Sequence, residues 1–174
     1  MLLVVDIGNT NVVLGLYEGT RLAHTFRISS VRTRTADEYG VMLYQLAQQR
    51  QIDVTAVEGT IVASVVPPLT EIMTNALRTT FAREPLVVGP GLKTGMSVLY
   101  ENPRDVGADR IVNAVAAYER VRGPLIVVDF GTATTFDAVS AKGEYLGGAI
   151  APGVEISVEA LGARGAQLRK VELV

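Results

Sequence analysis

The sequence contains no cysteine, one histidine and three lysines among its 174 residues. The absence of cysteine excludes both a disulfide framework and a thiolate metal site. The single histidine, His24, alternates with apolar neighbours, so we interpret it as structural, and no Ser/His/Asp triad can be assembled around it. The sequence also lacks the Gly-x-x-x-x-Gly-Lys-Ser/Thr phosphate loop. Any phosphate must therefore be bound without a loop lysine.

Long apolar runs and an excess of one charge are absent as well. No apolar run approaches the ~18 residues of a membrane helix, and Asp6 interrupts an N-terminus without a basic region, so we expect neither a signal peptide nor a membrane partner. The net charge of −2 gives nucleic acid little electrostatic attraction, and the basic cluster of Arg27, Arg32 and Arg34 fits a solvated loop. With 48% hydrophobic residues, the composition predicts one globular domain or two small ones.

An internal repeat is the main feature that the sequence does have. Leu125–Gly131 repeats Leu2–Gly8 with five of seven residues identical. Each copy is a short apolar run, rich in β-branched residues, that ends on an aspartate and a glycine turn: Asp6 in the first copy and Asp129 in the second. We therefore predict two buried strands that each deliver a carboxylate to a tight loop, with a second strand after each loop.

Small polar residues follow both Asp-x-Gly turns. They are Asn9, Thr10 and Asn11 in the first copy and Thr132, Thr134 and Thr135 in the second. Glycine lets backbone N–H groups approach an anion, Thr and Asn add hydrogen-bond donors, and aspartate oxygens suit Mg²⁺ or K⁺. Two such loops facing across a cleft could hold a polyphosphate and its metal. Asp-x-Gly is also ordinary turn chemistry at strand ends, although coincidence explains a matched pair poorly.

Residues 1–103 form the first predicted unit. A capping box at Thr35–Glu38 marks its first helix. Beyond the first hairpin, the pattern predicts strands at 21–28, 59–66 and 85–88 and helices at 35–49 and 69–80. This order implies a mixed sheet flanked by helices. Glycines in 89–103 resemble a dinucleotide fingerprint, but the spacing is one residue too long and no helix pattern follows, so we interpret this segment as a loop.

Residues 104–174 form the second predicted unit, which contains a clear helix at 108–121. The first turn of this helix holds Asp109 and Arg110, where free N–H groups and the helix dipole favour anions. Asp109 is then either an ordinary acid that stabilises the dipole or a functional group. Gly147–Gly153, which leads into a helix predicted at 154–166, could lie under a nucleotide or be only a tight connection.

Four segments, in order, resemble type III pantothenate kinases over essentially the whole chain. They are Asp6–Asn11, Gly107–Arg110, Asp129–Thr134 and Gly147–Gly153. The resemblance implies an α/β fold of two ribonuclease-H-like units, as in actin-like ATPases, and a cytoplasmic homodimer. It also implies ATP-dependent phosphorylation of pantothenate to 4′-phosphopantothenate, the first step of coenzyme A biosynthesis. Family members usually continue for several more helices and strands, so we expect the second unit to be incomplete.

The resemblance also implies roles for individual residues. The ATP phosphates would be held by Asp6, Gly8, Asn9, Thr10, Asn11 and Thr132, with Mg²⁺ at Asp6. The monovalent cation, K⁺ or NH₄⁺, would bind Asp129. Pantothenate would meet Tyr100, Gly107, Ala108, Asp109 and Arg110, with Asp109 as the proton acceptor.

Asp109 would act mainly by orienting the hydroxyl group. An unperturbed aspartate has a pKa of about 3.9, and a helix N-terminus lowers it, so its carboxylate is a weak base for an alcohol. In a loose phosphoryl-transfer transition state the proton leaves late, which makes strong basicity unnecessary. The alternatives are another actin-like ATPase, a sugar kinase, or a non-catalytic regulator that kept the fold.

Overall fold

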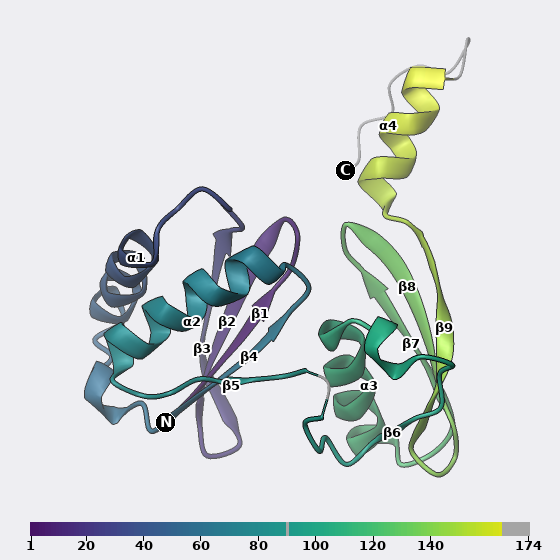
Figure 1. Ribbon diagram of the computed structural model, residues 1–174, viewed down its shortest axis with the longest axis horizontal. Helices are drawn as coiled ribbons and strands as arrows, with labels where there is room; N and C mark the ends of the chain where they lie inside the picture. Colours follow the sequence, from purple (N-terminus) through teal and green to yellow (C-terminus); the bar gives the residue numbers. More distant parts are fainter. Residues whose placement is uncertain (90, 165–174) are drawn as a thin grey trace. The chain divides into compact units, whose positions relative to one another are not determined.

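The computed structural model describes residues 1–89 and 91–164, which divide into two compact units (Figure 1). The first unit comprises Met1–Leu92 together with Gly107–Asp109. The second comprises Lys93–Val106 and the chain from Arg110 onward. None of the helices in the described ranges is both long enough and apolar enough to span a membrane.

The first unit is a five-stranded mixed sheet in the order β3-β2-β1-β4-β5. Strands β1, β2 and β3 are antiparallel neighbours, whereas β4 and β5 continue parallel to β1. The strands are β1 (Leu2–Ile7), β2 (Asn11–Glu18), β3 (Arg21–Ser29), β4 (Gly59–Ser64) and β5 (Leu86–Val87), with a 3₁₀ turn, η1 (Val54–Ala56), before β4. The predicted mixed sheet is confirmed.

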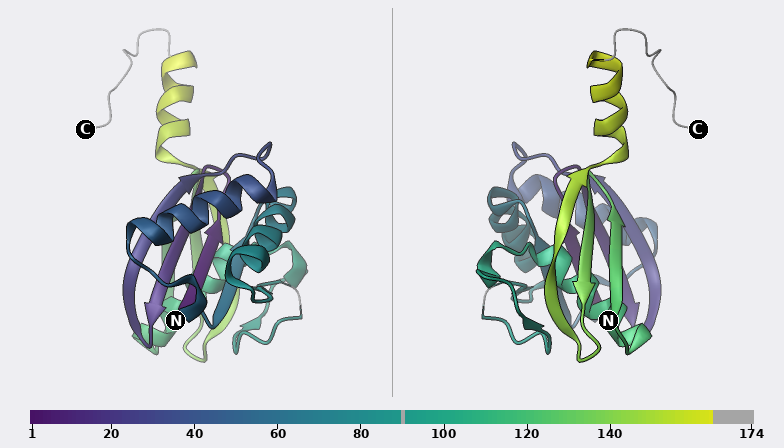
Figure 2. Two further views of the ribbon diagram at one scale, coloured as in Figure 1. Left: turned by 90° about the vertical axis from the view of Figure 1, so that its left-hand side faces the viewer. Right: turned by 90° about the vertical axis from the view of Figure 1, so that its right-hand side faces the viewer.

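Helices α1 (Ala36–Gln49) and α2 (Pro67–Phe81) both cover one face of this sheet (Figure 2). That face is mostly apolar, because buried side chains of β1 pair with buried side chains of β2, for example Val5 with Leu14, while Thr60 of β4 is a buried polar residue. The capping box at the start of α1 is confirmed, since the hydroxyl of Thr35 accepts from the Glu38 N–H and the Glu38 carboxylate accepts from the Thr35 N–H. The second helix begins earlier than predicted, because proline is well suited to a first helical turn.

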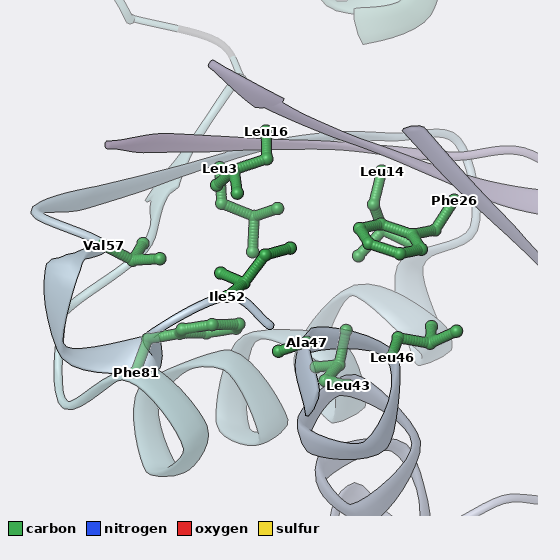
Figure 3. A pocket seen from close by; sticks show the side chains of 10 residues that line it. All are labelled: Leu3, Leu14, Leu16, Phe26, Leu43, Leu46, Ala47, Ile52, Val57 and Phe81. Carbon is green, nitrogen blue, oxygen red and sulfur yellow. The ribbon is translucent and has the colours of Figure 1, made fainter. Parts of the chain in front are cut away.

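A small cavity lies in the core of the first unit and is shown in Figure 3. Its volume is about 20 Å³, close to that of a single water. Side chains from the strands and from both helices point into it: Leu3, Leu14, Leu16, Phe26, Leu43, Leu46, Ala47, Ile52, Val57 and Phe81. An apolar cavity of this size stays dry and belongs to the core, so it is no substrate pocket.

Truncation of Leu14 should strongly destabilise the first unit. The Leu14 side chain is only 1% exposed, and Leu14→Ala would enlarge the cavity that it lines. We expect the free energy of unfolding to fall by about 2–5 kcal/mol, measured by urea denaturation. The matched control is Leu22→Ala, whose side chain is 49% exposed and should cost about 1 kcal/mol or less. Equal losses for the two variants would contradict this description of the core.

The second unit is a four-stranded mixed sheet in the order β6-β9-β8-β7. Its strands are β6 (Ser97–Val98), β7 (Leu125–Phe130), β8 (Ala133–Val139) and β9 (Glu144–Pro152). Its other elements are a 3₁₀ turn, η2 (Pro103–Asp105), and helices α3 (Ala108–Val121) and α4 (Val154–Arg164). The bounds predicted for α3 are confirmed, and its first two residues belong to the first unit. The predicted end of α4 at Ala166 lies outside the described residues.

Two local predictions in the second unit were wrong. Thr134 and Thr135 lie in β8 and not in the loop, because strand pairing resumes immediately after a three-residue turn. Residues 147–152 extend β9 through antiparallel pairing with β8, and the chain continues through Gly153 into α4. Residues 89–103 were expected to form a loop, but they contain β6, which pairs with β9. A strand of this length is too short to show a periodic pattern in the sequence.

One face of the second sheet packs against α3. Val139 and Tyr145 are buried there with Ile111 and Ala114 of the helix. On the opposite face of β7, alternate apolar side chains are exposed, and Phe130 at 74% is the most exposed of them. The buried apolar core of this unit is therefore smaller than that of the first unit.

Candidate functional site

The first Asp-x-Gly loop lies at the edge where β1 and β4 both end. The two strands are parallel, and Ile7 pairs with Ser64 at this edge. Ligands of α/β sheets bind outside the carboxyl ends of parallel strands. Asp6 is exposed here, and the Gly8 N–H donates to the Asn11 carbonyl oxygen at 3.0 Å, which closes the loop. The structure therefore presents a carboxylate and a tight loop at an edge suited to a ligand.

The segment after β3 fixes the first loop from the outside. The Ser30 hydroxyl donates to the Gly8 carbonyl oxygen at 2.6 Å, and the Ser30 N–H donates to the Thr10 carbonyl oxygen at 2.9 Å. Arg32 Nη2 donates to Asn9 Oδ1 at 3.2 Å. The sequence had suggested only a solvated loop for Arg32, but its exposed guanidinium lies at the first Asp-x-Gly loop. This arrangement places a cation beside a loop that has no lysine.

The start of α3 belongs to this same unit. Val65 follows β4, and its N–H donates to the Ile7 carbonyl oxygen at 3.1 Å. Gly107 lies against Val65, because a methyl group added to Gly107 would be 3.3 Å from Val65 Cγ1. The same methyl group would lie 2.5 Å from Asp109 Oδ1, so the carboxylate folds back over residue 107 and a side chain there would displace it. Asp109 is thus held on the unit that carries the first loop.

The second Asp-x-Gly loop is one residue shorter than the first. The Gly131 N–H donates to the Ala133 carbonyl oxygen at 3.0 Å, and Thr132 stands exposed at the tip. The Gly153 N–H donates to the Thr132 carbonyl oxygen at 3.1 Å, which ties the loop to the start of α4. The repeated sequence therefore forms a repeated strand-loop-strand unit with different turns.

Asp129 is exposed near the end of β7 and is held by the neighbouring helix. Asn113 Nδ2, on α3, donates to Asp129 Oδ2 at 3.1 Å. The sequence gave no signal for Asn113, because its partner lies 16 residues away and meets it only when α3 packs on the sheet. One amide thus orients the carboxylate of the second loop.

The remaining candidate residues of the second unit gather around Arg110. Tyr100 packs close to Gly147 of β9, since a methyl group there would be 3.3 Å from the Tyr100 ring. Arg110 forms an ion pair with Asp137 at 2.5 Å, and the Tyr145 hydroxyl donates to Asp137 Oδ1 at 2.6 Å. Burial is the main reason why the pKa of Tyr145 is raised above its ordinary value, and the hydrogen bond to Asp137 is the second. The phenol therefore stays protonated.

The exposed carboxylates suit a Mg²⁺ ion that binds together with substrate phosphates. They suit a metal ion bound by protein ligands alone less well. Among residues 1–89 and 91–164, no group of three or more His, Cys, Asp or Glu side chains could hold a metal ion. Mg²⁺ usually keeps several waters and binds one or two carboxylates plus substrate phosphates. An exposed Asp6 beside the first loop meets that requirement. Asp129 offers a single carboxylate, with the Asn113 amide beside it, which suits a weakly bound monovalent cation.

Comparison with known proteins identifies the family. The family model described as type III pantothenate kinase matches residues 2–174. A type III pantothenate kinase from Moorella thermoacetica is 58% identical over 174 residues, which are 100% of this chain and 68% of that protein. One from Anaeromyxobacter sp. (strain Fw109-5) is 60% identical over 172 residues, which are 99% of this chain and 68% of that protein.

The chain belongs to the type III pantothenate kinase family. Its fold also resembles that of other kinases and ATPases. A candidate 2-dehydro-3-deoxygalactonokinase from Sinorhizobium meliloti matches with a TM-score of 0.56 and 13% identity, over 97% of this type III pantothenate kinase homologue and 57% of that chain. At such low identity the match shows the fold alone. The predicted α/β fold of the ribonuclease-H-like, actin-like class is confirmed.

The predicted site residues of this type III pantothenate kinase homologue fall in both units. The first unit holds Asp6, Gly8, Asn9, Thr10, Asn11, Gly107, Ala108 and Asp109, and the second holds Tyr100, Arg110, Asp129 and Thr132. Sequence reasoning missed the residues that orient them, chiefly Ser30, Asn113, Asp137 and Tyr145. Only Asp137 carried a usable signal, because it is the one charged residue of β8.

Proposed function

We propose that this protein transfers the γ-phosphoryl group of ATP to the primary hydroxyl of pantothenate, giving ADP and 4′-phosphopantothenate. The observation that carries the proposal is the family match over residues 2–174. The exposed carboxylate and tight loop at the β1–β4 edge support it, because they suit a polyphosphate and its metal. The proposal includes a cytoplasmic homodimer that carries out the first step of coenzyme A biosynthesis, as the family resemblance implies.

In this proposal the first loop binds the ATP phosphates. Backbone N–H groups and the side chains of Asn9, Thr10 and Asn11 supply hydrogen bonds, and Thr132 contacts ATP from the second loop. Mg²⁺ at Asp6 and K⁺ or NH₄⁺ at Asp129 would offset charge on the phosphates. These roles follow from the chemistry of the side chains and from the family resemblance.

Asp109 accepts the proton in this proposal. The pantothenate hydroxyl oxygen forms a bond to the γ-phosphorus, the bond from that phosphorus to the ADP oxygen breaks, and the hydroxyl proton passes to the Asp109 carboxylate. The position of Asp109 supports the assignment, because its carboxylate lies over Gly107 in the first turn of α3, close to the backbone. Orientation is the larger contribution where the proton leaves late.

A coupled assay of ADP release tests the proposed function. Purified protein with ATP and Mg²⁺ should release ADP only when pantothenate is added, and the rate should saturate with pantothenate. The same assay with a sugar or with no second substrate is the control. An equal rate of ADP release with and without pantothenate would instead identify a plain ATPase.

Arg32 should contribute to ATP binding. Its guanidinium donates to Asn9 of the phosphate loop, and a cation there can pair with phosphate. Arg32→Ala should raise the KM for ATP about tenfold and leave the KM for pantothenate within twofold, as measured by steady-state kinetics. Arg27→Ala removes an exposed arginine of β3 and is the matched control. A similar rise in both variants would mean that general surface charge, rather than this contact, attracts ATP.

A further inference from the structure

We propose that Asp137, together with Tyr145, positions the Arg110 guanidinium for recognition of pantothenate. This inference rests on the proposed function, and it adds two residues that touch no substrate in the proposed mechanism. Asp137 lies in the middle of β8 and is 1% exposed, while Arg110 is 14% exposed. Both residues belong to the second unit.

The contacts hold one edge of the guanidinium against Asp137. Arg110 Nε donates to Asp137 Oδ1 at 2.7 Å, and Arg110 Nη2 lies 2.5 Å from the same oxygen. Because the guanidinium is a rigid planar fork, engaging the Nε and Nη2 edge turns the outer hydrogens of Nη1 away from Asp137. An arginine held in this way offers donors in one fixed direction.

Tyr145 and Thr135 also form hydrogen bonds with Asp137. The Tyr145 hydroxyl donates to Oδ1 at 2.6 Å, and the Thr135 hydroxyl donates to Oδ2 at 3.4 Å. Tyr145 is fully buried, so its hydroxyl has a fixed position. The carboxylate therefore cannot rotate freely, and the direction of Arg110 is set from the core of the unit.

Stability alone explains this buried pair poorly. A buried ion pair is often no more stabilising than apolar residues of similar volume, because both charges lose their water. The pair packs tightly against Gly148 of β9, where a methyl group would lie 2.4 Å from Arg110 Nη2 and 2.7 Å from Asp137 Oδ1, although the Phe136 carbonyl oxygen at 2.0 Å already requires glycine there. The guanidinium is therefore held closely between its carboxylate and the backbone of β9.

The location of the pair points to pantothenate rather than ATP. Arg110 follows Asp109 directly at the start of α3, and Tyr100 packs beside Gly147, next to Gly148 on β9. Pantothenate carries a carboxylate, hydroxyls and an amide, all of which can accept hydrogen bonds from a guanidinium. Arg110 and Tyr100 are the two pantothenate candidates of the second unit, and Asp137 orients the first of them.

Two variants test the inference, each with a matched control. Tyr145→Phe removes one hydroxyl and should raise the KM for pantothenate about three- to tenfold, whereas Asp137→Asn removes the charge and should raise it at least about thirtyfold. The KM for ATP should stay within twofold in both. Tyr118→Phe, which removes a hydroxyl bonded to the Ala141 carbonyl oxygen, and Asp105→Asn, at an exposed carboxylate, should leave both KM values unchanged. Calorimetric titration of pantothenate without ATP should show the same order of Kd values.

Wild-type protein measured in parallel distinguishes failure of the proposed function from failure of this inference. If wild type shows no pantothenate-dependent ADP release and no pantothenate binding, the proposed function falls, and this inference falls with it. If wild type is active and folded Tyr145→Phe keeps both its KM and its Kd for pantothenate, Asp137 and Tyr145 serve structure only. Tyr145→Phe alone decides the question where Asp137→Asn fails to fold. A parallel rise in the KM values for ATP and pantothenate would also overturn the inference.

Discussion

Asp109→Asn should lower kcat by about 10²–10⁴-fold, the usual contribution of a positioned acid or base. The substitution keeps the shape of the side chain and removes the charge that accepts the hydroxyl proton. The side chain packs over Gly107, so the amide should occupy the same place, and the KM for ATP should change little. Steady-state ADP release at saturating pantothenate measures the effect.

Asp37→Asn is the matched control for this prediction. Asp37 is an acid in the first turn of α1, as Asp109 is in the first turn of α3, and Asp37 is exposed whereas Asp109 is half-buried. Both substitutions remove a favourable interaction with a helix dipole, worth about 0.3–1 kcal/mol. The control should therefore lose a little stability and no activity. An Asp109→Asn enzyme within twofold of wild type would show that Asp109 only stabilises its helix.

Asp129→Ala should abolish stimulation by K⁺. The carboxylate is exposed near the second loop and is hydrogen-bonded by Asn113, so its removal should harm cation binding more than folding. Rates should be compared over a series of KCl concentrations at constant ionic strength. ADP should be quantified by chromatography, because coupling enzymes can have cation requirements of their own.

Glu119→Ala serves as the control for the cation experiment, since Glu119 is an exposed carboxylate on α3. It should respond to K⁺ as wild type does. If Asp129→Ala keeps a wild-type response and wild type is stimulated, the cation binds elsewhere and the second loop has another role.

The sequence predicted the features that depend on neighbouring residues. The capping box at Thr35 and Glu38 is local, and so is the alternation of buried and open positions that identifies β1. The repeat of β1 in β7 predicted both hairpins, because each turn is determined by the few residues that form it. The turn at Gly131 is shorter than expected, but this error did not affect the prediction of the strands on either side.

Contacts between distant residues could not be predicted in this way. Arg110 and Asp137 are 27 residues apart and meet only because α3 packs across β8. Asn9 and Arg32 are 23 residues apart and meet because β3 ends beside the first loop. A single sequence does not show how a helix packs on a sheet, or in which register strands pair, between residues so far apart in the chain. The candidate loops were therefore recognisable, whereas the residues that orient them were not.

Direct detection of the product tests the central claim most directly. After incubation of the purified protein with ATP, Mg²⁺, K⁺ and pantothenate, mass spectrometry and ³¹P NMR would measure 4′-phosphopantothenate against ADP, with Asp109→Asn as the blank. The account predicts equal amounts of the two products, and almost none with the variant. ADP without phosphorylated pantothenate, or inorganic phosphate in its place, would contradict it.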